Sequence, residues 1–499
     1  MRFEEWIRLI TGIALALPEF SSTRLYQSNT LNFTMSAIEK TYFEQFASIV
    51  GDSNVIQDTE SLAKYAQDFS PFPAISPKLV VRPSTVKQVS QILEFANQNH
   101  LKIITRGGGV SFTGFEQVTE RTILLETKRM SRVLDLNESN MTVTAECGIV
   151  LNALEEAVSR KGFYINTVSV PVKFSTLGGI LSGVVGGGLP IRGPEAGTDQ
   201  HYLLGMKVVL PTGKILETSA GGSNVHMKHD FIRGGNGPDL TGMFVGDAGC
   251  FGVKVEATMQ IFPNRPLVQT GAWVFETFDQ VWAAMRRLLL LEPLPYTQLK
   301  VRDTDEIVLT YVTESQSKAI NELNTTAIET ICRENSGKEG SESLQEVARQ
   351  YTSFMRQDNR VTEPQGMVAY MIGNSEFPTT YTHSKKIVHE AMREKYLEKE
   401  GVQFFSTFRP NTHNGIYVNF ALKYDPTRPK GKAEVLELTK ELYRYAISNG
   451  GCPEPHQGFG ALLMARAWSP EYLSLMKDLK MLLDPNDVLN PNTWGIYSK

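Results

Sequence analysis

Apolar residues recur with two different periods in the first part of the chain. Between residues 84 and 99 they lie three or four positions apart, at Val89, Ile92, Leu93 and Ala96. This spacing predicts an amphipathic helix with Ser84 as its N-cap, and a second helix is predicted over 151–160. Short apolar or alternating runs, typical of strands, surround these helices; they lie at 78–82, 101–104, 122–127 and 141–147.

A hairpin, a short helix and a longer strand follow. Residues 206–210 and 214–217 flank Pro211-Thr212-Gly213, which predicts a β-hairpin. The short helix, the strand and a proline-rich boundary are predicted at 238–244, 253–262 and 263–266.

After residue 266 glycine becomes rarer and longer helical stretches alternate with strands. Helices are predicted at 278–291, 318–334, 382–400 and 432–448, and strands at 299–302, 368–372 and 416–424. This order is typical of an α+β domain with an antiparallel sheet. Near the end, Ser469 and Pro470 have the N-cap and first-turn chemistry of a helix that continues to about residue 483.

The sequence therefore predicts an α+β protein in four parts. Residues 1–34 form an extension, 35–265 a domain of two α+β subdomains, and 266–468 a cap domain with an antiparallel sheet flanked by helices. Residues 469–499 are expected to return to the first domain. The extension is too short in its apolar part to span a bilayer. We expect it to be disordered, with organelle or secretory targeting as the alternative.

Three glycine-rich stretches suggest a binding site. Gly107, Gly108 and Gly109 follow a predicted strand, eight of the 40 glycines lie within 178–197, and a third stretch is 246–253. Because glycine has no Cβ, consecutive N–H groups can turn toward one point and hold an anion such as phosphate. A flexible turn is the simpler alternative, but a flexible linker would lack the apolar residues that alternate with glycine in 178–197.

A dinucleotide would use all three stretches, because it combines two phosphates with two flat ring systems. The first loop lacks the sixth-position glycine of a Rossmann fingerprint, and it does not open an apolar-periodic helix. The Gly-Lys-Ser/Thr of a Walker A loop is also absent. Arg106, Ser111 and Thr113 add charge and hydroxyl donors near the first loop.

Composition narrows the remaining classes. The net charge is −4 without a long basic stretch, so no nucleic-acid partner is expected. The four cysteines are scattered without a C-x-x-C pair, which favours a reducing compartment such as the cytoplasm and argues against a disulfide framework or zinc site. We expect no transmembrane segment, and a homodimer is compatible with the sequence.

Seven motifs in a fixed order carry a family resemblance. They are VRPST (81–85), TRGGGVSFTG (105–114), ECG (146–148), TLGGILSG (176–183), LLGMKVVLPTGKIL (203–216), GPDLTGMFVGDAGCFGVKVEATMQIFP (237–263) and LDPNDVLNP (483–491). In order and spacing they resemble the vanillyl-alcohol oxidase and p-cresol methylhydroxylase superfamily of FAD enzymes, with D-2-hydroxy-acid dehydrogenases (D-lactate, glycolate) as the nearest members. The resemblance implies that 35–265 is an FAD-binding domain.

The resemblance also implies which residues contact FAD. The first loop would hold the pyrophosphate through Gly107, Gly108, Gly109, Val110 and Ser111, with Arg106, Thr113 and Gly114 in the same motif. The flavin and ADP region would be lined by Thr176, Gly178, Gly179 and Ser182. The isoalloxazine or ribityl chain would meet Gly249, Gly252 and Val253, and Asn490 would close the site.

The resemblance further bears on how FAD is attached. Some members attach FAD through a histidine in the glycine loop, where this chain has Val110, and residues 164–177 contain neither His nor Cys. Non-covalent FAD is therefore expected, with attachment through a histidine of the cap domain as the alternative.

Candidate catalytic residues come from two polar segments. Arg409, His413 and Tyr417 lie in 409–419, and His456 lies in 454–460. A group that takes the hydroxyl proton eases hydride transfer from carbon to flavin N5. Each of the four could bind or deprotonate a substrate, although a surface or structural role is the alternative for each.

The same segments depart from two known subgroups. In the hydroxy-acid dehydrogenases of this family, two histidines and a later Glu-His bind a divalent metal, but Pro410 and Tyr417 stand at the histidine positions here. We therefore expect no metal, although Glu454 and His456 preserve part of that pattern. The Tyr-Arg pair of the phenol oxidases is replaced by Leu462 and Leu463.

These observations predict an FAD-dependent oxidoreductase acting on a small molecule. Hydride would pass from a hydroxyl-bearing carbon, with a 2-hydroxy acid favoured, to flavin N5, and oxygen or another acceptor would reoxidise the flavin. An aromatic alcohol or secondary-metabolite oxidase of the same superfamily is the alternative. A flavin-binding protein without redox turnover is the alternative from another class.

Overall fold

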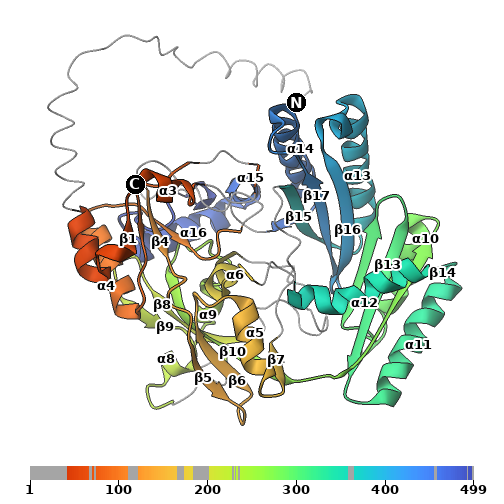
Figure 1. Cartoon of the computed structure of the whole chain (residues 1–499), viewed down its shortest axis with the longest axis horizontal. Coiled ribbons are helices and arrows are strands. Elements are labelled where there is room, and N and C mark those ends of the chain that lie inside the picture. Colours follow the sequence, from red (N-terminus) through yellow and green to blue (C-terminus); the bar gives the residue numbers. More distant parts are fainter. Residues whose placement is uncertain are drawn as a thin grey trace. The chain divides into compact units, whose positions relative to one another are not determined.

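The computed structural model describes twelve stretches of the chain. They are residues 42–66, 70–71, 75–110, 122–165, 173–183, 202–227, 230, 232–233, 237–357, 365–454, 458–491 and 493–496. Residues Phe46–Lys499 form one compact unit, which contains every element described below. Its described strands belong to three sheets (Figure 1).

The first sheet holds the strand that leads into the Gly107–Gly109 loop. Its order is β1 (Val55–Ile56), β2 (Leu79–Val81), β4 (Ile123–Glu126) and β3 (Ile103–Arg106). Strands β2, β4 and β3 are parallel, and the predicted helix α4 (Val86–Gln98) connects β2 to β3. The N-cap of α4 is Thr85, whose hydroxyl accepts from the Gln88 N–H, so the prediction of Ser84 was wrong by one residue. Ser84 instead donates its own N–H to the Gln88 side chain.

The second sheet is antiparallel and carries the predicted hairpin. Its order is β5 (Val133–Asn137), β6 (Thr142–Glu146), β10 (Val253–Pro263), β8 (Leu203–Val209) and β9 (Ile215–Glu217), with β7 (Phe163–Ile165) paired to β10. Its core also receives residues from α5 (Leu151–Ser159), α6 (Leu177–Gly183), α9 (Leu240–Met243) and α16 (Pro470–Leu483). Ser469 caps α16 as predicted.

The third sheet is also antiparallel and has eight described strands. Their order is β14 (Lys338–Glu339), β11 (Leu267–Phe275), β13 (Ile307–Ser315), β12 (Gln298–Asp303), β16 (Gln403–Thr412), β17 (Gly415–Lys423), β15 (Gln365–Gly373) and β18 (Cys452–Glu454). The helices that accompany it are α10 (Phe278–Leu288), α11 (Lys318–Glu334), α12 (Glu342–Gln357), α13 (Phe377–Glu394) and α14 (Pro429–Ser448). The predicted α+β class is confirmed.

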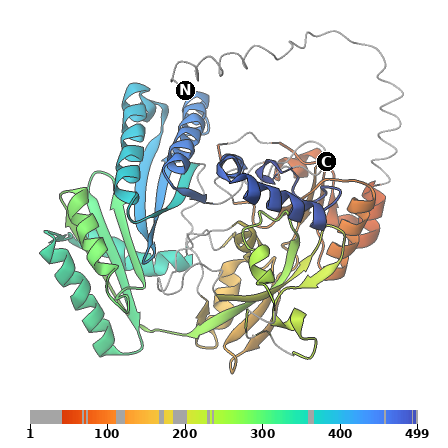
Figure 2. The same ribbon diagram turned by 180° about the vertical axis from the view of Figure 1, so that it is seen from behind.

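The two faces of the third sheet differ in what covers them. Alternate strand residues such as Val301, Phe408 and Val418 pack with α10, α11, α13 and α14 into one large core, and Figures 1 and 2 show these helices beside the sheet. On the opposite face, Ala272 and Val308 pack against α12. The remaining part of that face lies on β12, β16 and β17 and carries polar side chains, among them Arg302, Arg409 and Asn419. We call it the polar face.

Helix α15 (Gly458–Ala467) joins the cores of the second and third sheets. Ala465 is buried in the core of the second sheet, and Leu463 packs against the core of the third. The helix therefore belongs to both packing units at once.

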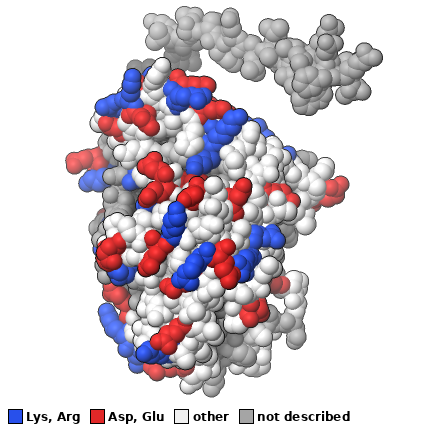
Figure 3. Space-filling model, turned by 90° about the vertical axis from the view of Figure 1, so that its right-hand side faces the viewer, with Lys and Arg blue, Asp and Glu red and all other residues white. Residues whose placement is uncertain are grey.

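One face of the molecule is mixed in charge. On the face drawn in Figure 3, acidic and basic side chains are interspersed, and the described residues there form no extended area of one sign. Within the described stretches, no helix has both the length and the apolar character needed to cross a bilayer.

Candidate functional site

The first glycine loop lies against residues 174–176. A Cβ added to Gly107 would collide with the Thr176 hydroxyl, and one added to Gly108 would collide with the Phe174 carbonyl oxygen. Gly109 has φ +69°, a backbone conformation that favours glycine. Close contacts with Phe174 and Thr176, together with this conformation, thus explain why these three positions are glycine.

The second and third glycine stretches are joined by backbone hydrogen bonds. Gly246 donates to the Leu181 carbonyl over 2.9 Å, and Ala248 donates to the Ser182 carbonyl over 3.0 Å. A Cβ added to Gly178 would lie 3.0 Å from the Cβ of Cys147, and one added to Gly252 would collide with Val208. Helix α6 and the loop before β10 therefore hold each other at a fixed spacing.

A pocket opens where the three stretches meet. It is lined by Thr105, Arg106, Gly107, Thr127, Gly178, Gly179, Ser182, Gly252, Val253 and Lys254, and it encloses about 360 Å³ of free space, part of it open to solvent. Among the described residues, its lining includes two cations and no carboxylate. Such a wall of bare peptide and positive charge suits an anionic ligand.

Apart from Asn490, which is described below, the residues predicted to bind a cofactor divide into three groups. Seven line the pocket: Arg106, Gly107, Gly178, Gly179, Ser182, Gly252 and Val253. Five lie beside it in the neighbouring loops: Gly108, Gly109, Val110, Thr176 and Gly249. Ser111, Thr113 and Gly114 lie outside the described residues.

The side chain of Arg106 packs against the first glycine loop. Its side chain is buried, its Nη1 donates to the Tyr65 carbonyl over 3.1 Å, and its guanidinium lies 5.5 Å from the centroid of the Tyr65 ring. A Cβ added to Gly109 would collide with the guanidinium. The arginine therefore occupies the space that a side chain on the loop would need.

Asn490 connects the C-terminal segment to two of the pocket's walls. Its Oδ1 accepts from the Thr105 N–H over 2.9 Å, and its Nδ2 donates to the Ala248 carbonyl over 2.7 Å. Its own N–H donates to the Ile103 carbonyl over 2.8 Å. Asn490 thus fixes the end of β3 relative to the third glycine stretch.

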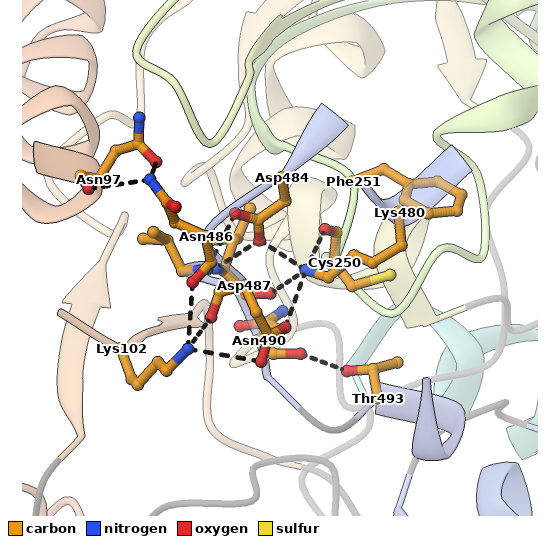
Figure 4. A network of polar contacts seen from close by, with 12 residues as sticks. Asn97, Lys102, Cys250, Phe251, Lys480, Asp484, Asn486, Asp487, Asn490 and Thr493 are labelled. Carbon is orange, nitrogen blue, oxygen red and sulfur yellow. Dashed lines mark hydrogen bonds and ion pairs between the residues drawn. The ribbon is translucent and has the colours of Figure 1, made fainter. Parts of the chain in front are cut away.

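A buried lysine, which the sequence analysis did not identify, reinforces this junction (Figure 4). Lys480 Nζ donates to the carbonyls of Cys250 and Leu489 over 3.1 and 2.7 Å, and to Asp484 Oδ2 over 2.6 Å. The Asp484 side chain is fully buried and also accepts the N–H groups of Val488 and Leu489, each over 2.9 Å. Backbone hydrogen bonds to the Lys480–Asp484 ion pair thus hold the LDPNDVLNP segment (483–491) in place.

A second buried ion pair lies in the pocket wall. Lys254 donates to Asp247, and their side chains are 1% and 0% exposed. Asp247 also accepts the N–H groups of Gly249 and Phe251, over 2.7 and 3.3 Å. Burial raises the pKa of Asp247, while the Lys254 ammonium and these N–H groups act in the opposite direction. Neither residue was identified from the sequence.

Arg409 and Tyr417 lie opposite each other on β16 and β17 of the polar face. The guanidinium carbon is 3.9 Å from the centroid of the tyrosine ring, and the residues are 6% and 5% exposed. This is a cation–π contact in a desolvated setting, where such contacts are strongest. The structure therefore brings these two candidates together.

Only one of the two candidate histidines lies among the described residues. His413 lies in the turn between β16 and β17, is exposed, and pairs with the exposed Glu292 over 3.4 Å. His456 lies outside the described residues. Among the described residues, no group of three or more His, Cys, Asp or Glu side chains could hold a metal ion.

Further polar residues share the face with Arg409, and two of them, Arg302 and Asn419, have buried atoms without a partner among the described residues. Arg302 and Asn419 both pair with Thr407 in the sheet register, so their side chains leave the same face. Arg302 Nε and Asn419 Oδ1 are buried, and the described residues offer neither a hydrogen-bond partner. Arg302 is a diagonal cross-strand neighbour of Arg409, which places their Cα atoms about 7–8 Å apart. The alternation of Lys300, Val301 and Arg302 was the signal that could have placed Arg302 on this face.

Comparisons with known proteins agree with this architecture. Residues 77–219 match the FAD binding domain family, and residues 288–493 match the C-terminal domain of the FAD linked oxidases. Glycolate oxidase subunit GlcD of Bacillus subtilis is 24% identical over 476 residues, covering 91% of this chain and 96% of the relative. D-Lactate dehydrogenase of Archaeoglobus fulgidus is 25% identical over 449 residues, covering 86% and 94%. The solved structure of p-cresol methylhydroxylase superposes with a TM-score of 0.76 at 18% identity, covering 92% and 97%.

The three sheets, the pocket and both matching domains define the chain as an FAD-linked oxidoreductase. More narrowly, its fold is similar to that of p-cresol methylhydroxylase, and the FAD binding domain indicates FAD as its cofactor. The pocket fits this group, because its described lining is rich in bare backbone and contains two cations but no carboxylate.

Proposed function

We propose that this protein oxidises a 2-hydroxy acid, transfers its hydride to flavin N5, and is reoxidised by oxygen or another acceptor. The observation that carries the proposal is Arg409, a buried cation on the polar face with Arg302 as its diagonal neighbour. Like charges this close repel each other, so an anion between them would stabilise the pair. A carboxylate suits the planar guanidinium because it can accept two parallel hydrogen bonds.

The names of two relatives support the choice of acid. Glycolate and D-lactate are both 2-hydroxy acids, in which the carboxylate is attached to the carbon that loses hydride. A cation that fixes this carboxylate therefore also fixes the reacting carbon, and positioning of this kind lowers the barrier to a bond-breaking step.

Each candidate residue has a distinct task in this proposal. Arg409 binds the carboxylate, and the ring of Tyr417 holds the guanidinium in one orientation. FAD supplies the hydride acceptor. We propose His456 as the group that takes the hydroxyl proton, since imidazole changes charge near neutral pH. We assign His413 no step, because it is exposed and paired with Glu292.

We further propose that FAD is bound without a covalent bond. Cys147 is the thiol nearest to the pocket-lining Gly178, and burial raises its pKa far above the ordinary range. A thiol without thiolate character is a poor nucleophile toward a flavin. Acid precipitation tests how the flavin is attached. Yellow colour in the supernatant supports non-covalent binding, and yellow colour in the pellet contradicts it.

We also propose that residues 35–265 and 469–499 serve the cofactor and that 266–468 serve the substrate.

An aromatic alcohol is a second candidate, and the Arg409–Tyr417 pair supports it as well. A guanidinium held against a tyrosine could equally stabilise a phenolate, as an anion of similar charge.

Anaerobic bleaching of the flavin tests the two candidates together. Glycolate, D- and L-lactate and 2-hydroxyglutarate are compared with lactamide, which keeps the hydroxyl but lacks the carboxylate, and with a phenolic benzylic alcohol. Bleaching by an acid but not by lactamide supports the 2-hydroxy acid. Bleaching by the phenolic alcohol alone supports the second candidate, and bleaching by none contradicts both.

A further inference from the structure

The Lys254–Asp247 pair is unusual because both partners are fully buried. Removing two charges from water is costly unless their geometry and hydrogen bonds compensate. Asp247 has such compensation from two backbone N–H groups of its own loop. Lys254 has less, because among the described residues its acceptor beyond Asp247 is the Gly252 carbonyl at 3.4 Å. An ammonium has three donors, so among the described residues one N–H of Lys254 has no acceptor.

The pair is oriented with respect to the pocket. Lys254 is part of the pocket lining, whereas Asp247 is not. The carboxylate is held by Gly249 and Phe251, within the loop that precedes β10. The lysine is thus the partner that belongs to the pocket wall, and the aspartate lies behind it in the loop. The pair adds no net charge to the fold, but it adds positive potential to one wall of the cavity.

We infer that Lys254 is a cofactor-positioning residue that recognises the diphosphate of FAD, with Asp247 as the internal counter-ion that keeps the ammonium charged. The diphosphate is the anionic part of the cofactor, and Arg106 is the other cation in the lining. A lysine acts as a point charge on phosphate. This inference rests on FAD as the cofactor and not on the proposed substrate, so the two can fail independently.

The test compares two ligands that differ by the diphosphate. The double variant Lys254→Met/Asp247→Asn removes both charges without leaving an unpaired buried ion. Apoprotein is titrated with FAD by fluorescence quenching, and ADP and adenosine are measured by competition with FAD. The variant should bind FAD and ADP about ten- to a hundredfold more weakly, the range for a hydrogen bond to a charged group. Adenosine binding should be unchanged.

The ratio of ADP to adenosine affinity is the decisive quantity. A purely structural role of the pair would lower both affinities together, because both ligands need the same fold, and an unchanged ratio therefore overturns the inference. The matched control is Lys207→Met/Glu256→Gln, which removes a half-buried ion pair of 2.7 Å from the same sheet, outside the pocket lining. A similar change in that control would also contradict the inference.

Discussion

The cofactor pocket and the polar face of the third sheet bring together distant residues in different ways. In the pocket, irregular backbone does the positioning, and buried ion pairs such as Lys480–Asp484 hold that backbone in place. On the polar face, regular strands do the positioning, and Arg409 and Tyr417 are simply opposite each other in the register. A site made of backbone tolerates few changes, whereas a site made of strand side chains can change its chemistry while the fold persists.

The largest expected effect tests whether the pocket depends on its ion pairs. Lys480→Met leaves Asp484 buried without its counter-ion and removes the bonds to Cys250 and Leu489. We expect a loss of about 3–5 kcal/mol in the free energy of unfolding, because an uncompensated buried charge remains. Urea unfolding measures the loss, and the purified variant should have less bound flavin. The exposed pair of Lys318 and Glu322 provides the control, since Lys318→Met should change stability by less than about 1 kcal/mol. An equal loss of stability in Lys480→Met and Lys318→Met would contradict the idea that the pocket depends on its buried ion pairs.

The next effect tests whether the polar face acts on the substrate alone. Arg409→Met should lower kcat/KM for a 2-hydroxy acid by about two to three orders of magnitude, since a buried charged hydrogen-bond partner is lost. FAD affinity should be unchanged because Arg409 is not part of the cofactor pocket. Steady-state kinetics and flavin titration separate the two quantities, with His413→Gln as the exposed control. A variant that loses flavin as well would show that the two regions are not independent.

A smaller effect tests the close packing of the first loop. The methyl group of Gly108→Ala would collide with the Phe174 carbonyl, whereas that of Gly179→Ala would lie 3.1 Å from Thr176 Oγ1, a much milder contact. Forcing a methyl group into packed backbone costs about 1–3 kcal/mol, so Gly108→Ala should lower stability and flavin content more than Gly179→Ala. Thermal unfolding with and without FAD measures both. The reverse order would mean that the loops are not packed as described.

The smallest effect concerns the partly exposed Asp239, the N-cap of α9. The pKa of Asp239 is lowered: burial acts against the shift, and Arg233 and the Gly242 N–H outweigh it. A lowered folded pKa gives stability that is present above the unfolded value of 3.8 and is lost as pH falls through the folded value. Asp239→Asn keeps the cap, so it should cost at most about 1 kcal/mol at neutral pH, after allowance for screening by solvent. This cost should vanish below the folded pKa of Asp239 in urea titrations at several pH values, and a cost that persists there would exclude the charge as its cause.

The sequence patterns identified regular elements better than the side chains that join them. Helix α11 was predicted at its observed bounds, because 318–334 has a clear period and an N-cap at Ser317. Strand β13 was missed, because eight of its nine residues are buried and leave no alternation. Helix α12 was missed as well, since it is polar along most of its length.

The candidate site divides in the same manner. Glycine motifs can be recognised because backbone conformation limits the residue type, so the pocket-lining glycines were found. Lys254 and Lys480 were not found, since a single lysine in a sequence is most often solvated, and only the fold shows that these two are buried. Arg302 required knowledge of strand register, which depends on pairing between segments distant in the chain.

The bonds made by Asn490 also bear on the order of synthesis and cofactor loading. Thr105 and Asn490 are separated by 385 positions, so a ribosome that has finished the first two sheets has not yet made the residue that bonds their loops. Contacts of such long sequence separation form late and slowly. Loading of FAD should consequently follow translation of the C-terminal segment, and a nascent chain stalled before residue 480 should emerge without flavin.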